Sequence, residues 1–162
     1  MAPKLEQHFT VRVYLTKDTS LSLKGIKGGP TRVILPITKG FVKGKGLEAE
    51  ITGGGDYILL DPTTNVCHLN VRTQARTATG TSNYIHYNGT LKVDEATSKV
   101  ISWSPDANTT NYGDHKWFVT PIMETDDEEF KWIEDQTWVG QGHWIVEGGE
   151  TAVEYEVYQV VN

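Results

Sequence analysis

The stretch CHLNVRTQART, residues 67–77, alternates apolar or small side chains with polar ones along its whole length. A period of two is what a strand needs when one of its faces is buried and the other meets solvent. The segment therefore predicts a half-buried β-strand, and the rest of the chain can be compared with it.

Similar segments lie on both sides of this strand. Apolar, aromatic and β-branched residues recur in short runs, with Gly, Pro, Asn and Asp between them, which is typical of an antiparallel barrel or sandwich. Closing the sheet would remove its exposed edges, so we expect an all-β fold, a small closed antiparallel β-barrel. The further expected strands are 9–15, 31–37, 46–51, 56–60, 84–93, 117–124, 137–145 and 152–161.

Two glycine-rich segments and one acidic segment interrupt this pattern. Residues 43–46 and 53–56 are expected to be tight turns between strands, because neither has the Gly-Lys-Ser/Thr of a phosphate-binding loop. Residues 126–133 are expected to form one short helix or 3₁₀ turn, with Thr125 as N-cap and Glu128 completing a capping box. No repeat or linker divides the chain, which predicts a single domain over residues 1–162.

Composition narrows the classes of partner. A net charge of −6 with scattered Lys and Arg argues against nucleic-acid binding. No stretch is apolar enough to span a membrane, and the N-terminus lacks the apolar core of a signal peptide. We expect a soluble protein, cytoplasmic as given or secreted if a leader has been removed. The single cysteine, Cys67, forms no internal disulfide and is interpreted as a small buried residue.

Four ordered motifs resemble those of the DUF3237 family, also catalogued as UPF0311. They are residues 28–40, 46–57, 71–77 and 117–125, and the resemblance extends from about residue 9 to residue 161. Family members often carry an acid where this chain has Asn70, and Thr-Asp-Asp-Gly where it has residues 77–80. The resemblance implies a barrel similar to those of lipocalins, with a central cavity.

The resemblance also implies a class of chemistry. Some fungal members resemble natural-product tailoring enzymes that dehydrate a tropolone alcohol to a quinone methide and promote its hetero-Diels–Alder capture by an alkene. Such a protein would need no cofactor, and its partner would be a small molecule; a homodimer is left open. Two alternatives remain: a non-catalytic small-molecule-binding barrel, and a simple dehydratase or isomerase acting on a phenolic or polyketide substrate.

Candidate catalytic residues are cationic or titrate near neutral pH. Arg32 and Arg72 lie in the best-matching motifs and are expected to point inward, where each guanidinium would hold an acidic enol through two hydrogen bonds. On one strand, Arg72 shares its face with Gln74 and Arg76, so the alternative is a stripe facing solvent. His115 is the third candidate, as a general acid or base.

Candidate substrate-binding residues combine polar groups with flat aromatic walls. An inward stripe of arginines would need an acidic partner such as Asp56, a tyrosine hydroxyl would polarise a leaving group, and tryptophan rings would cover a planar ligand. No histidine pair has the spacing of a metal site, so no metal is expected. The expected binding set is Asp56, Tyr57, Gln74, Tyr87, Trp117, Thr120 and Trp138.

Overall fold

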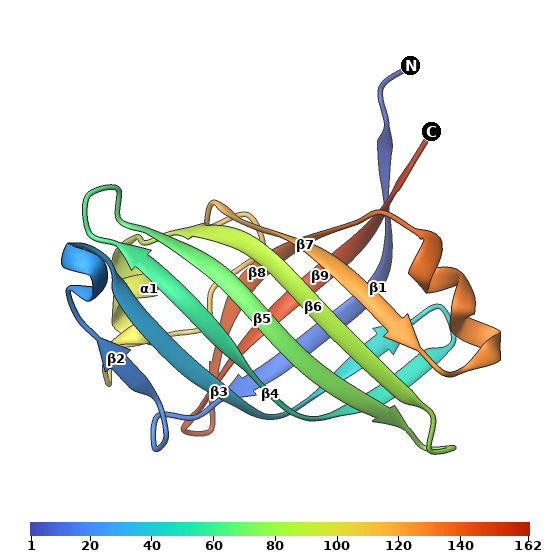
Figure 1. Cartoon of the computed structure of the whole chain (residues 1–162), viewed down its shortest axis with the longest axis horizontal. Coiled ribbons are helices and arrows are strands. Elements are labelled where there is room, and N and C mark those ends of the chain that lie inside the picture. The colour runs from blue at the N-terminus through green and yellow to red at the C-terminus, as the bar shows by residue number, and fades with distance from the viewer.

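The computed structural model describes all 162 residues and contains a closed eight-stranded antiparallel barrel (Figure 1). Each strand pairs with its neighbours in the order β1-β9-β8-β7-β6-β5-β4-β3, and pairing of β1 with β3 closes the circle. The predicted fold class is confirmed. The strands are β1 (Lys4–Leu15), β3 (Thr31–Gly44), β4 (Leu47–Asp61), β5 (Val66–Thr77), β6 (Ser82–Lys92), β7 (Trp117–Thr125), β8 (Trp138–Glu147) and β9 (Glu150–Val161).

The alternation of side chains along the strands explains the closed sheet. Buried and exposed residues alternate without interruption along β7, and nearly so along β5. One face of each strand supplies the interior, where 29 buried residues form a single hydrophobic cluster. A short ninth strand, β2 (Leu21–Leu23), pairs only with β3 and lies outside the barrel circle.

The glycines at 53–55 do not form the expected turn. The two strands expected at 46–51 and 56–60 are parts of one long strand, β4, which begins at Leu47 and carries a bulge between Ile51 and Gly53. A Cβ atom on Gly54 would lie 2.3 Å from the backbone oxygen of Arg72, so a glycine is required where β4 and β5 come close together. The other predicted turn is confirmed: Lys45 and Gly46 join β3 to β4 with φ values of 47° and 86°.

Helices lie at the two ends of the barrel (Figure 1). The predicted helix is present as a 3₁₀ helix, η2 (Glu128–Asp135), but its N-cap is Asp127, whose side chain accepts from the Glu129 amide. The Thr125 hydroxyl accepts from the Asp127 amide, just before the helix begins. An unpredicted helix, α1 (Glu95–Ile101), lies at the other end, near β2. A 3₁₀ turn, η1 (Ile26–Gly28), follows β2.

No helix of the chain is both long enough and apolar enough to cross a membrane.

Candidate functional site

Asp56 is the only acidic residue among the buried residues of the barrel. It lies on β4 opposite Leu35 of β3 and Val71 of β5, and both of these neighbours point into the core. The Asp56 side chain therefore also belongs to the inner face, and the residue is only 9% exposed.

Burial raises the pKa of Asp56 to about 7, because the charged carboxylate loses its hydration. One interaction acts in the opposite direction: the backbone N–H of Asn70 donates to Asp56 Oδ1 at 3.1 Å. No Lys or Arg forms an ion pair with this carboxylate. Asp56 is therefore divided between its protonated and ionised forms near neutral pH, which is the condition that favours a general acid or base.

Two tyrosines lie close to this carboxyl inside the barrel, and a tryptophan packs against one of them. The Tyr87 and Tyr155 ring centroids are 5.2 Å apart, and Trp117 lies 5.6 Å from Tyr155. Burial, with a smaller effect from Asp56, raises the pKa of both phenols, so their hydroxyls remain protonated. The Trp117 Nε1 atom is buried and has no hydrogen-bond partner. The interior thus presents several hydrogen-bond donors beside one titrating acid.

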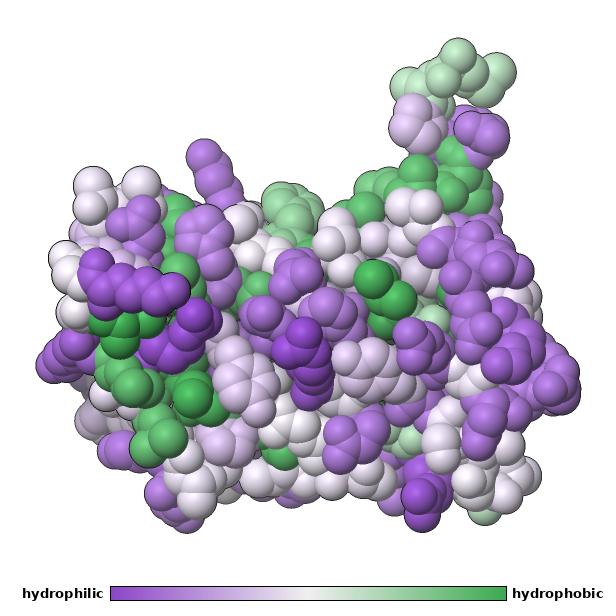
Figure 2. All heavy atoms as spheres, in the orientation of Figure 1, coloured by the Kyte–Doolittle hydropathy of each residue, from purple (hydrophilic) through white to green (hydrophobic).

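An apolar pocket of about 310 Å³ lies at the α1 end of the barrel. Its walls come from β3, β4, β5 and β2, and from the residues that end α1. This is also the end where Figure 2 shows hydrophobic side chains at the surface near β2. The apolar lining includes Leu35, Ile58, Leu60, Cys67, Ile101 and Trp103.

Asp56 does not line this pocket itself, but two of the lining residues are its neighbours. Leu35 is its cross-strand neighbour, and Ile58 lies two residues further along the same face of β4. Burial, and to a smaller extent the Asp56 carboxylate, raises the pKa of the Cys67 thiol to about 11. Cys67 is therefore a protonated wall residue and not a nucleophile.

Trp103 contributes a strained wall to the pocket. Its φ of 57° is in the left-handed region, which is unfavourable for a bulky residue. Such conformations gather at binding and catalytic sites, where the surrounding structure holds them in place.

The centre of the barrel does not contain the ligand-sized cavity that was expected there. The middle of the barrel is filled by side chains such as Tyr87, Val119 and Tyr155, which leave a void of about 10 Å³. The apolar pocket with room for a ligand is at the α1 end, whereas a more polar and more open hollow of about 710 Å³ lies near η2.

The inward orientation expected for Arg72 and Gln74 is wrong. Both side chains lie on the outer, exposed face of β5, and so does Arg76, because Val71, Thr73 and Ala75 occupy the inner face. The reason is that burying an unpaired guanidinium in the core would cost far more free energy than burying a valine or threonine side chain.

Arg32 also points outward and is half-buried, since Val33 and Leu35 take the inner face of β3. It forms no ion pair with Asp56, and its Nη1 donates instead to the backbone oxygen of Tyr57 at 2.8 Å. The side chains of Tyr57 and Thr120 are exposed on the outer surface, away from the pocket.

His115 is buried, but both of its ring nitrogens are already occupied. Nδ1 lies 2.5 Å from Asp94, the N-cap of α1, and Nε2 lies 2.9 Å from the Thr110 hydroxyl. The residue therefore ties α1 to the following loop and does not point an open nitrogen at the pocket. Trp138 is buried at the η2 end, where its indole N–H donates to the Ile133 carbonyl.

Of the predicted residues, the structure thus brings together Asp56, Tyr87 and Trp117. The sequence analysis did not include Tyr155 among the candidate site residues, although its place in an alternating strand could have indicated that it faces the interior. It also missed Trp103, because α1 was not predicted.

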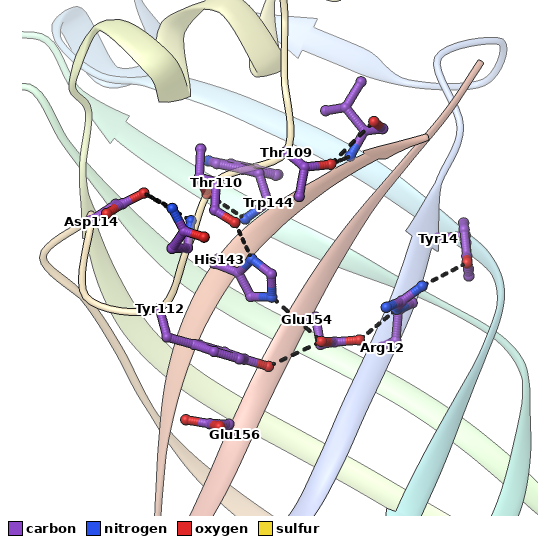
Figure 3. Close-up of polar contacts among 12 residues, drawn as sticks. Arg12, Tyr14, Thr109, Thr110, Tyr112, Asp114, His143, Trp144, Glu154 and Glu156 are labelled. Atoms are coloured by element: carbon purple, nitrogen blue, oxygen red, sulfur yellow. Dashed lines mark hydrogen bonds and ion pairs between the residues drawn. The ribbon is translucent and has the colours of Figure 1, made fainter. Parts of the chain in front are cut away.

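A second polar cluster lies on the outer face of β1, β8 and β9 (Figure 3). Glu154 is its centre. Arg12 Nε donates to Glu154 Oε2 at 2.5 Å, the Tyr112 hydroxyl donates to Oε1 at 3.2 Å, and His143 Nε2 lies 3.4 Å from the same oxygen.

This cluster fastens a loop to the barrel. His143 Nδ1 lies 2.8 Å from the Thr110 carbonyl, and the Tyr112 ring packs against the His143 imidazole with centroids 4.1 Å apart. Both oxygens of Glu154 are engaged, so the arrangement offers a substrate no free acid or base. No group of three or more His, Cys, Asp or Glu side chains is placed to hold a metal ion.

Comparisons with known proteins agree on the fold. Residues 3–160 match the family described as "Protein of unknown function (DUF3237)". No curated protein matches the chain.

Three solved structures are similar over 99% of this chain. A conserved protein of unknown function from Rhodopseudomonas palustris is 21% identical, with a TM-score of 0.82 and 99% of its own length covered. A beta-barrel like protein from Acinetobacter baumannii is 21% identical, with a TM-score of 0.74 and 97% covered. An enzyme from Penicillium herquei is 14% identical, with a TM-score of 0.64 and 96% covered. At these identities the likeness shows the fold alone.

Proposed function

The chain belongs to the DUF3237 family, and we propose that it is a cofactor-independent enzyme that moves a proton through Asp56 on a planar, oxygen-bearing small molecule. The observation that carries the proposal is a buried carboxyl with a pKa of about 7 next to Leu35 and Ile58, which line an apolar pocket. Perturbed acids in such settings are found preferentially at active sites. The fold it shares with an enzyme from Penicillium herquei is compatible with this role.

The pocket suits one ring system with a short substituent. Its volume of about 310 Å³ is at the lower end of small-molecule sites. Apolar walls such as Leu60 and Trp103 would cover the faces of a planar ligand, while its oxygens would be directed toward Asp56.

The finer proposal is dehydration of a hydroxymethyl-substituted tropolone. Protonated Asp56 gives its proton to the departing hydroxyl while the carbon–oxygen bond breaks, and water leaves. The resulting carboxylate takes the proton of the ring hydroxyl, which forms a quinone methide and restores the acid. Each turn releases one water, and no oxidant or reductant is consumed.

Capture of the quinone methide by an alkene needs no further proton transfer. A cycloaddition forms its two new bonds together, so the protein has only to hold the reactants in contact and in the right orientation. Positioning of this kind can remove roughly 7–11 kcal/mol of a bimolecular barrier.

Isotope exchange tests the proton-transfer step without knowledge of the alkene. A hydroxymethyl tropolone is incubated with the protein in ¹⁸O-labelled water, and mass spectrometry follows label entering the hydroxymethyl group. If dehydration is reversible, exchange in the parent should be well above the rate in buffer. Asp56→Asn should lose this exchange. Arg72→Leu should keep it, because the Arg72 side chain is on the outer surface.

Exchange that is equal in the parent and in Asp56→Asn would contradict the assigned role of Asp56. Tropolone binding, followed by tryptophan fluorescence, with no exchange in the parent would favour the non-catalytic binding barrel instead.

A further inference from the structure

The pairing of β4 with β5 is interrupted beside Asp56. Asp56 pairs with Val71, and Leu59 pairs with His68, in one continuous register. The two positions between them, Tyr57 opposite Asn70 and Ile58 opposite Leu69, form no pair. In an antiparallel ladder, alternate opposite residues exchange two N–H···O=C bonds, so this gap leaves backbone groups in need of partners.

Two side chains supply partners from opposite sides of the barrel wall. From the inside, the Asp56 carboxylate accepts the Asn70 N–H at 3.1 Å. From the outside, Arg32 donates to the Tyr57 carbonyl at 2.8 Å. These are the two ends of the bond that a regular ladder would form between Asn70 and Tyr57.

We infer that Arg32 is a positioning residue: by occupying the Tyr57 carbonyl it keeps the two strands unpaired here and leaves the Asn70 N–H to hold the Asp56 carboxylate. Its importance for turnover rests on the proposed function, but the contact itself does not. Arg32 touches neither the pocket nor the carboxyl, so it acts only through the backbone.

Loss of the guanidinium has a defined consequence. A carbonyl left without a donor at a strand pair takes the nearest available N–H, and for Tyr57 that is the opposite Asn70. The ladder closes, and Asp56 loses its one hydrogen bond. Since that bond favours the ionised carboxylate, the Asp56 pKa moves further above its usual range.

Solution NMR tests this without any ligand. In the parent, the Asn70 amide shift should follow the ionisation of Asp56. In Arg32→Leu the Asn70 amide shift should no longer follow that ionisation. A coupling across a hydrogen bond should appear between the Asn70 nitrogen and the Tyr57 carbonyl carbon. The pKa of the Asp56 carboxyl should rise by about one unit, a tenfold change in its ionisation constant.

Two variants separate the contact from simple charge. Arg72→Leu removes a cation from the same outer surface, opposite Gly55 of β4, and should leave the Asp56 titration and the Asn70 amide as in the parent. Arg32→Lys keeps a donor in place and should also behave as the parent, which covers the case in which Arg32→Leu does not fold.

An Asn70 amide that still follows Asp56 in Arg32→Leu would overturn the inference, and so would an equal pKa change in Arg72→Leu. If Arg32→Leu does not fold, loss of the Asp56–Asn70 coupling in Arg32→Lys would overturn it. Failure of the isotope-exchange experiment would leave these outcomes unaffected, so the two proposals can fail separately.

Discussion

Replacement of Asp56 by asparagine should change the pH dependence of stability, with the larger gain in stability at high pH. Asparagine has the same shape, and its Oδ1 atom can still accept the Asn70 N–H, so the local contact survives. What it removes is the ionisation of a buried group. The variant therefore isolates the energetic consequence of placing a titrating carboxyl in the core.

The sign follows from the two pKa values. The unfolded pKa is 3.8 and the folded pKa is about 7, so the native state binds the proton more tightly. Asp56 is neutral in both states below the unfolded pKa. Its burial destabilises the fold increasingly as the pH rises above that value, and the effect is complete once the pH has risen through about 7. The full difference is roughly 4 kcal/mol, of which about 3 kcal/mol falls between about pH 5 and about pH 8.

Urea denaturation of the parent and of Asp56→Asn at these two pH values measures the effect. The gain in free energy of unfolding caused by Asp56→Asn should be about 3 kcal/mol larger at about pH 8 than at about pH 5. Asp61→Asn is the matched control. Hydrogen bonds from Thr64 and Thr63 lower the pKa of this exposed carboxyl, so it is ionised at both pH values. Parallel pH profiles for parent and Asp56→Asn would refute the reasoning, because they would mean that Asp56 ionises as it does in water.

Two further substitutions test the scaffold. Gly54→Ala should lower the free energy of unfolding, measured by thermal denaturation, by at least about 2 kcal/mol, because the new Cβ meets the Arg72 backbone oxygen at 2.3 Å. A stability equal to the parent's would show that β4 and β5 can separate. Glu154→Ala should cost about 1–3 kcal/mol, because it leaves the partly buried Arg12 without its carboxylate. The exposed Glu150→Ala should change little, and equal effects of the two glutamate variants would contradict the part assigned to the outer cluster.

The barrel was predictable because the period of two is strong in nearly every strand. Residues 67–77 show it clearly, and β5 covers that segment with one extra residue at its start. Glycine runs were harder to interpret. Residues 53–55 have the composition of a turn, yet they lie inside β4, where close approach of β5 excludes a side chain. Only the three-dimensional arrangement distinguishes these two uses of glycine.

The candidate site was predictable only in part, because a period of two identifies two faces and does not say which one is buried. In β5 the face of Val71 and Ala75 is the more apolar, and this already favoured an outward Arg72. The resemblance to a family with small-molecule chemistry led to the opposite interpretation. The burial of Asp56 follows from its register against Leu35 and Val71, which no local pattern reveals.

Helix α1 escaped prediction for a local reason. It is only seven residues long, and its buried residues are Thr97 and Val100, so it has no apolar stripe to detect. Its cap at Asp94 is clear only in retrospect, through the amide of Thr97 and the imidazole of His115.

The most direct test of the central claim is the ¹³C titration of the Asp56 carboxyl, with and without saturating tropolone. We expect a midpoint of about 7 in the free protein, moved upward when the acidic enol of tropolone occupies the pocket, because a neighbouring anion disfavours the carboxylate. A midpoint near the ordinary value of about 4, or one that tropolone does not move, would contradict the account.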